Sequence, residues 1–147
     1  ILHSRVALSN IYGLQKMGAK VALCGPPHLI PRGIKDLGVI VNSNIDEVID
    51  WADAVNILRI QRERMGIGII PSTREYRKYF GITQERISSF KKDIVIMHPG
   101  PINRGVEIDS SVADGQQAII LDQVLNGVAV RMSILYLLLG SLDEDNN

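Results

Sequence analysis

Three short segments hold most of the residues that could bind a small charged molecule. They are His3-Ser4-Arg5-Val6-Ala7, Leu58-Arg59-Ile60-Gln61-Arg62-Glu63-Arg64 and His98-Pro99-Gly100-Pro101-Ile102-Asn103-Arg104-Gly105. Each one follows an apolar run that is typical of a buried β-strand. Together they supply guanidinium groups, an amide, an imidazole and a stiff Pro-Gly-Pro turn, a set that suits a small substrate with more than one anionic group.

Arg5 lies in the first turn of a helix predicted over residues 4–17. A cation there opposes the helix dipole, so it has a local cost that a ligand would explain. The helix N-terminus and Arg5 together would bind a carboxylate or phosphate. By position alone, this role and that of an ordinary surface arginine are equally well supported, and Ser4 is expected to be the N-cap.

Arg59 and Gln61 leave a predicted strand at alternate positions, so their side chains are expected on the same side. A guanidinium can bind a carboxylate through two parallel hydrogen bonds, and an amide can add a neutral donor. Gln61 alone is better explained by solvation at a strand end. Arg62, Glu63 and Arg64 are interpreted as an ion-paired cluster that shapes the loop.

The Pro99-Gly100-Pro101 turn follows a strongly apolar strand. The two prolines stiffen the backbone and leave carbonyl groups without strand partners, so these carbonyls could accept hydrogen bonds from an amino or amide group. His98 alone is interpreted as a structural residue, hydrogen-bonded inside the turn. The residues expected to brace the loop are Asn103, Arg104 and Glu107.

The other candidate motifs do not indicate a metal, dinucleotide or phosphate site. His3, His28 and His98 have no spacing that indicates a metal site, and no metal is expected. No Gly-x-Gly-x-x-Gly motif follows the first strand, which disfavours dinucleotide binding, and no cofactor is expected. Residues 72–75 resemble a phosphate-binding turn but are interpreted as a capped helix start.

The elements that must position these residues alternate between strand and helix. Strands are predicted at 1–2, 20–24, 39–41, 54–58 and 94–97, and helices at 4–17, 31–37, 44–51, 73–79, 83–91 and 116–139. The pattern predicts an α/β, three-layer Rossmann-like domain with a mostly parallel sheet of about five strands and helices on both faces. Because the carboxyl ends of parallel strands face one crevice, the three segments are expected to converge there.

Composition narrows the class of protein. The 147 residues fit a single domain, and sixteen basic and sixteen acidic residues give zero net charge, so neither nucleic acid nor an anionic membrane is an expected partner. The single cysteine, Cys24, excludes an internal disulfide and fits a reducing compartment, so a cytoplasmic location is expected. Because the sequence starts inside an apparent strand at Ile1, we expect a fragment of a longer chain.

The last predicted helix is very apolar. Polar residues interrupt it, so a membrane span is not expected. They are Asp122, Gln123, Asn126 and Arg131. We expect a helix that is buried on more than one side, with the absent part of the chain as the partner for its surplus apolar surface.

The three segments together resemble the aspartate carbamoyltransferase family. The family patterns HSRVARSN, LRIQRER and HPGPxNRGVEI stand here as HSRVALSN, LRIQRER and HPGPINRGVEI, and residues 126–132 resemble the family's last helix. The resemblance covers nearly the whole chain but only the carboxyl-terminal, aspartate-binding half of such an enzyme. Leu8 departs from the pattern, because an arginine is common at that position.

The resemblance implies a role for each motif. Arg5 and Arg59 would hold the two carboxylates of L-aspartate, with Gln61 assisting. Backbone groups of Pro99, Gly100 and Pro101 would meet the carbamoyl group of carbamoyl phosphate and the attacking amine. The phosphate-binding loop and the catalytic histidine belong to the amino-terminal half, so no catalytic residue is expected in this chain, which alone should be inactive.

The resemblance also implies partners and leaves two alternatives. Family enzymes are homotrimers, and the absent amino-terminal domain would complete each site. One alternative is a related carbamoyltransferase of the ornithine type, which the paired arginines disfavour because ornithine has a single carboxylate. The other is a non-catalytic module that binds small acids.

Overall fold

The computed structural model describes residues 4–60, 72–90 and 93–144. In these residues the β-structure consists of four short strands. They are β1 (Ala22–Cys24), β2 (Ile40–Asn42), β3 (Ala54–Asn56) and β4 (Val95–Met97). β1 pairs with β2 and β3 pairs with β4, both in parallel, with Leu23 opposite Val41 and Val55 opposite Ile96. The predicted parallel α/β pattern and the positions of these four strands are therefore confirmed.

The arrangement differs from the predicted single sheet of about five strands. The described strands form two separate two-stranded sheets, β1–β2 and β3–β4, and the strand expected at residues 1–2 lies outside the described residues. Each strand is three residues long, so its free edge offers few backbone N–H and C=O groups for pairing with a further strand. Side-chain packing provides a link instead, since Cys24 at the end of β1 packs against the core around β3 and β4.

The helices match most of the predicted positions. They are α1 (Arg5–Lys16), α2 (Ile45–Trp51), α3 (Thr73–Phe80), α4 (Gln84–Ser89), α5 (Ser110–Ala113) and α6 (Ile120–Glu144), with 3-10 turns η1 (Pro27–Leu29) and η2 (Ile34–Leu37). Side-chain oxygens of Ser4, Asn44, Ser72 and Thr83 cap α1 to α4, which confirms the cap predicted at Ser4 and the capped helix start predicted at residues 72–75. The helix predicted at 31–37 is reduced to η2, and neither η1 nor α5 was predicted.

The buried apolar residues form two clusters. The larger one surrounds β3 and β4 and includes Ile49, Ile96 and Ile108, each 1% exposed. The smaller one joins α1 to β1 and β2 through Ile11 and Leu23. The loop after β4 therefore belongs to the larger cluster, whereas α1 packs into the smaller one.

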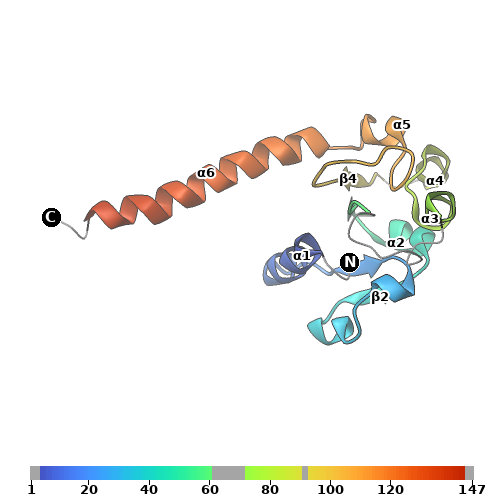
Figure 1. Cartoon of the computed structure of the whole chain (residues 1–147), viewed down its shortest axis with the longest axis horizontal. Coiled ribbons are helices and arrows are strands. Elements are labelled where there is room, and N and C mark those ends of the chain that lie inside the picture. Colours follow the sequence, from blue (N-terminus) through green and yellow to red (C-terminus); the bar gives the residue numbers. More distant parts are fainter. Residues whose placement is uncertain (1–3, 61–71, 91–92, 145–147) are drawn as a thin grey trace.

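Helix α6 projects from the body of the molecule (Figure 1). Its approach is tied to β4, because Ile96 N donates to Gln117 O (2.8 Å) and Ile119 N donates to Ile96 O (2.9 Å). Beyond that anchor, apolar side chains such as Leu121 are exposed, so the predicted burial on more than one side is not found in this structure. By length and composition alone, Ile120–Gly140 could cross a membrane, and within this range Ile120 is the one residue that belongs to the buried core.

Candidate functional site

The histidine after β4 is held inside its loop. His98 is fully buried; its backbone N–H donates to Gln123 Oε1 and its Nδ1 accepts from the Gly100 backbone N–H, both at 2.9 Å. Because Nδ1 is the acceptor, a neutral ring carries its proton on Nε2. The prediction that His98 is a structural residue, bonded inside the turn, is confirmed.

This arrangement presents the turn itself at the surface. Gly100 has φ +66°, a conformation that glycine adopts without a Cβ penalty, and the Gly100–Pro101 peptide is cis. Pro99 is half-buried, whereas Gly100 and Pro101 are exposed. The turn therefore offers backbone groups to a ligand, while the hydrogen bond between His98 and the Gly100 N–H fixes the start of the turn.

A buried carboxylate braces the same loop from the other side. Glu107 is fully buried, its Oε1 accepts from Asn103 N at 2.5 Å, and that oxygen lies 3.5 Å from His98 Nε2. At the surface, Arg104 forms a bidentate pair with Asp114, at 2.7 and 2.8 Å. Hydrogen bonding to Arg104 holds the pKa of Asp114 below its ordinary value. The bracing predicted for Asn103, Arg104 and Glu107 is confirmed.

The segment that carries Arg59 lies against this loop. Ile57 N donates to Met97 O at 2.9 Å, which continues the pairing just beyond β3, and Asn103 Nδ2 donates to Ile60 O at 3.2 Å. Arg59 is half-buried next to that contact. Two of the three predicted segments therefore converge. Gln61, like residues 62–64, lies outside the described residues.

Arg5 belongs to another part of the fold. It is exposed in the first turn of α1, after the Ser4 cap whose Oγ accepts from Ala7 N at 3.2 Å. Helix α1 packs through Ile11 into the smaller core cluster. Among the described residues, no hydrogen bond or ion pair joins Arg5 to the 98–105 loop, so convergence of all three segments stays a prediction.

Two polar residues that position this region were not predicted to do so. Gln123 was noted only as an interruption of the apolar helix, yet it receives the His98 N–H. Asp109 accepts from Arg77 Nη2 through both oxygens, at 2.8 and 3.0 Å, and so ties α3 to the start of α5. An isolated amide on an otherwise apolar helix was the available signal for Gln123.

Tyr76 and Cys24 add two half-buried weak acids to the same region. Burial raises the pKa of Tyr76, and the nearby charge of Glu107 raises it further. Burial also raises the pKa of the Cys24 thiol to about 11, while the charge of Arg86 lowers this pKa and that of Asp46 raises it. Both groups are therefore neutral at pH 7, and Cys24 is not an activated nucleophile.

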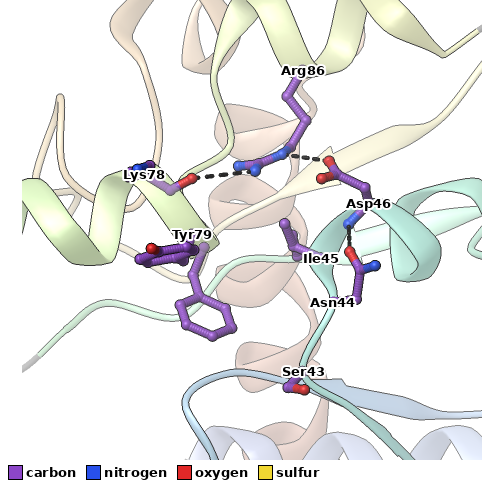
Figure 2. Close-up of a pocket in the computed structure, with 8 residues that line it drawn as sticks. Ser43, Asn44, Ile45, Asp46, Lys78, Tyr79 and Arg86 are labelled. Carbon is purple, nitrogen blue, oxygen red and sulfur yellow. Dashed lines mark hydrogen bonds and ion pairs between the residues drawn. The ribbon is translucent and has the colours of Figure 1, made fainter.

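A pocket of about 270 Å³ lies elsewhere, between the start of α2 and helices α3 and α4. Two of its charged groups form an ion pair, since Arg86 Nε pairs with Asp46 at 2.6 Å, and Arg86 Nη2 donates to the backbone carbonyl of Lys78, as Figure 2 shows. None of the predicted site residues lines this pocket. It is a junction between helices, whose ion pair satisfies the groups that a ligand would need.

Metal chemistry has no obvious place in the described part of the chain. Within residues 4–60, 72–90 and 93–144, no group of three or more His, Cys, Asp or Glu side chains is arranged to hold a metal ion. The donors of the site are instead backbone groups and a guanidinium. These bind anions and polar groups without a metal.

The fold and these loops define the class of protein. It is an α/β domain in which the loops that follow parallel strands present groups able to bind a ligand. The family described as "Aspartate/ornithine carbamoyltransferase, Asp/Orn binding domain" matches residues 2–138, and the chain belongs to this family. The resemblance drawn from the three motifs is therefore confirmed.

Sequence relatives agree with this assignment. The chain is 59% identical over 144 residues to the aspartate carbamoyltransferase catalytic subunit of Gemmatimonas aurantiaca, covering 98% of this chain and 45% of that protein. It is 58% identical to the catalytic subunit of Christiangramia forsetii, with 98% and 46% covered. The chain thus spans about half the length of the curated relatives it matches.

Solved structures share the fold. An ornithine carbamoyltransferase from Gloeobacter violaceus aligns with a TM-score of 0.72 at 18% identity, covering 88% of this chain and 46% of that one. Aspartate transcarbamoylase from Trypanosoma cruzi, solved with carbamoyl phosphate, aligns with a TM-score of 0.64 at 26% identity, with 79% and 39% covered.

Proposed function

We propose that the chain is the aspartate-binding half of an aspartate carbamoyltransferase, which transfers the carbamoyl group of carbamoyl phosphate to L-aspartate and releases phosphate. The observation that carries the proposal is the hydrogen bond from Asn103 Nδ2 to Ile60 O (3.2 Å), since it joins the segment that contains Arg59 to the loop that contains the Pro99-Gly100-Pro101 turn. Relatives near 59% identity bear the name of that enzyme. N-carbamoyl-L-aspartate, an intermediate of pyrimidine synthesis, is the expected product.

In this proposal the side chains bind and orient the acceptor substrate. Arg59 and Arg5 each hold one carboxylate of aspartate, with Gln61 as an additional donor. Carbonyl groups of Pro99, Gly100 and Pro101 accept hydrogen bonds from the attacking amine and from the carbamoyl nitrogen. Fixing both reactants in this way supplies much of the rate enhancement, because the reaction becomes effectively unimolecular.

The proposed chemistry is acyl transfer without a cofactor. The aspartate amine lone pair forms a C–N bond to the carbamoyl carbon, which gives a tetrahedral intermediate. The C–O bond to phosphate then breaks, and phosphate leaves with the electron pair and takes up the proton that the amine loses. Charge that develops on the former carbonyl oxygen needs donors, which we assign to the amino-terminal half of the full-length enzyme.

The proposal extends to the partners of the chain and to the location of the full-length enzyme. We propose that an amino-terminal carbamoyl-phosphate domain completes each site in a cytoplasmic homotrimer, and that protein rather than lipid covers α6. Charges at Asp122 and Arg131 support a protein environment, because charges are costly in a bilayer. In that assembly the two short sheets would form one continuous sheet within a three-layer domain.

The second candidate is the ornithine type, which the fold favours as strongly, since ornithine enzymes align with TM-scores of up to 0.72. Calorimetry on the purified chain separates the two. We expect succinate and N-carbamoyl-L-aspartate to bind, L-norvaline to bind more weakly, and Arg59→Ala to abolish dicarboxylate binding. Tighter binding of L-norvaline, or an Arg59→Ala variant that binds as the wild type does, would contradict the aspartate assignment.

A further inference from the structure

The buried His98–Glu107 pair has no part in the function proposed above. Both side chains are 0% exposed, and their closest atoms, His98 Nε2 and Glu107 Oε1, lie 3.5 Å apart. Among the described residues, His98 Nε2 and Glu107 Oε2 have no hydrogen-bond partner. An apolar pair would fill the same space at a lower desolvation cost, so stability alone does not account for these residues.

The proposed site has two arms, the Arg59 segment and the Pro99-Gly100-Pro101 turn. The pair lies in the middle of a series of contacts that joins them. On one side, Glu107 Oε1 accepts from Asn103 N (2.5 Å), and Asn103 Nδ2 donates to Ile60 O (3.2 Å), directly after Arg59. On the other side, His98 Nδ1 accepts from Gly100 N (2.9 Å) inside the turn. The route from Arg59 to the turn therefore runs through buried polar groups.

We propose that His98, Glu107 and Asn103 are positioning residues that set the separation between Arg59 and the Pro99-Gly100-Pro101 backbone. The inference rests on the proposed function, because that function requires both arms to hold one molecule. None of the three needs to touch the substrate. Their effect is on the geometry, where an error of about 1 Å costs on the order of a hundredfold in rate.

Three variants separate positioning from general damage. Glu107→Gln keeps the shape and the Oε1 acceptor but removes the charge beside His98. Asn103→Ala removes only the contact with Ile60 and lies at a half-buried position, where folding tolerates it better. Asp114→Asn is the matched control, since it makes the same carboxylate-to-amide change on the exposed partner of Arg104.

The choice of ligand supplies a readout that a merely structural role would not change. N-carbamoyl-L-aspartate engages both arms, whereas succinate engages the arginines alone. By calorimetry we expect Glu107→Gln and Asn103→Ala to weaken the binding of N-carbamoyl-L-aspartate about tenfold and that of succinate less than about twofold. Loss of one hydrogen bond is enough for a tenfold change in affinity. Asp114→Asn should change neither affinity. Equal weakening of both ligands, or no weakening, would overturn the positioning role.

Nuclear magnetic resonance of the ligand-free chain keeps this test separate from that of the proposed function. If the wild type binds neither ligand, the proposed function loses its support. The positioning role is then tested separately, by the protonation of the His98 ring and the exchange rate of the Gly100 amide. We expect ¹⁵N shifts with the proton on Nε2, and a Gly100 amide that exchanges about tenfold faster in Glu107→Gln, in line with one weakened hydrogen bond. A proton on Nδ1, or an unchanged exchange rate, would overturn the inference.

Discussion

The substitution Ile96→Ala tests whether β4 is the centre of the larger core cluster. Ile96 is 1% exposed, whereas Val95, the preceding residue of the same strand, is 38% exposed. This contrast follows from strand geometry, because successive side chains point to opposite faces. The strand also leads directly into His98, so its stability matters for the loop that follows.

The expected loss is large. The change removes about three methylene equivalents from the core, each worth ~0.8 kcal/mol, which gives about 2.4 kcal/mol for transfer to water. The cavity that remains adds to this, so the free energy of unfolding should fall by about 3–4 kcal/mol. Against a typical total of ~5–15 kcal/mol, this loss removes a large part of the stability.

Urea unfolding, followed by circular dichroism and by fluorescence of the single tryptophan, Trp51, measures the loss. Ile96→Val should cost ~1 kcal/mol and guards against a variant too unstable to study. Val95→Ala is the control on the same strand and should cost less than Ile96→Ala. Equal losses for Ile96→Ala and Val95→Ala would refute the assigned facing of β4.

Three further predictions concern other parts of the chain. Burial raises the pKa of Cys24 to about 11, so alkylation by iodoacetamide at pH 8 should be much slower than for a free thiol and should recover in urea. Since the folded state keeps this proton longer than the unfolded state, stability should fall as pH rises from about 9 toward 11, and a flat profile would contradict the assignment. Asp109→Asn should lower the free energy of unfolding by about 1–3 kcal/mol through its lost charge-assisted bonds to Arg77, measured in urea; a neutral result would show that this contact is dispensable. The exposed apolar face of α6 should make the isolated chain self-associate with concentration in sedimentation velocity, and Leu125→Glu or Leu135→Glu should reduce this; a monomer at every concentration would count against it.

Local chemistry explains which elements could be predicted. Asn44 and Thr83 each have a side-chain oxygen that accepts from a backbone N–H two or three residues later. The start of a helix therefore depends on a few consecutive residues, which the sequence shows directly. Apolar runs such as 94–97 identify strands for the same reason. The failures lie where local signals are weak: η2 replaces a predicted helix between Gly33 and Gly38, both with positive φ.

The candidate site likewise has features that the sequence predicts and features that it does not. The residue types of Arg5, Arg59 and the Pro99-Gly100-Pro101 turn were recognisable from motifs, because binding groups must be present whatever holds them. The contacts that hold them were not, since Gln123 reaches His98 across 25 positions and Asn103 reaches Ile60 across 43. A linear pattern gives no measure of such separations.

Local and periodic sequence patterns were thus sufficient for the positions of the four described strands and of most helices, for helix caps, for the α/β class and for the family. Three features depended on the folded chain: the division of the strands into two pairs, the complete burial of Glu107 beside His98, and the exposure of α6. Each is a matter of which distant surfaces meet. Burial of a carboxylate depends on the partners that surround it, and exposure of an apolar helix depends on what is there to cover it.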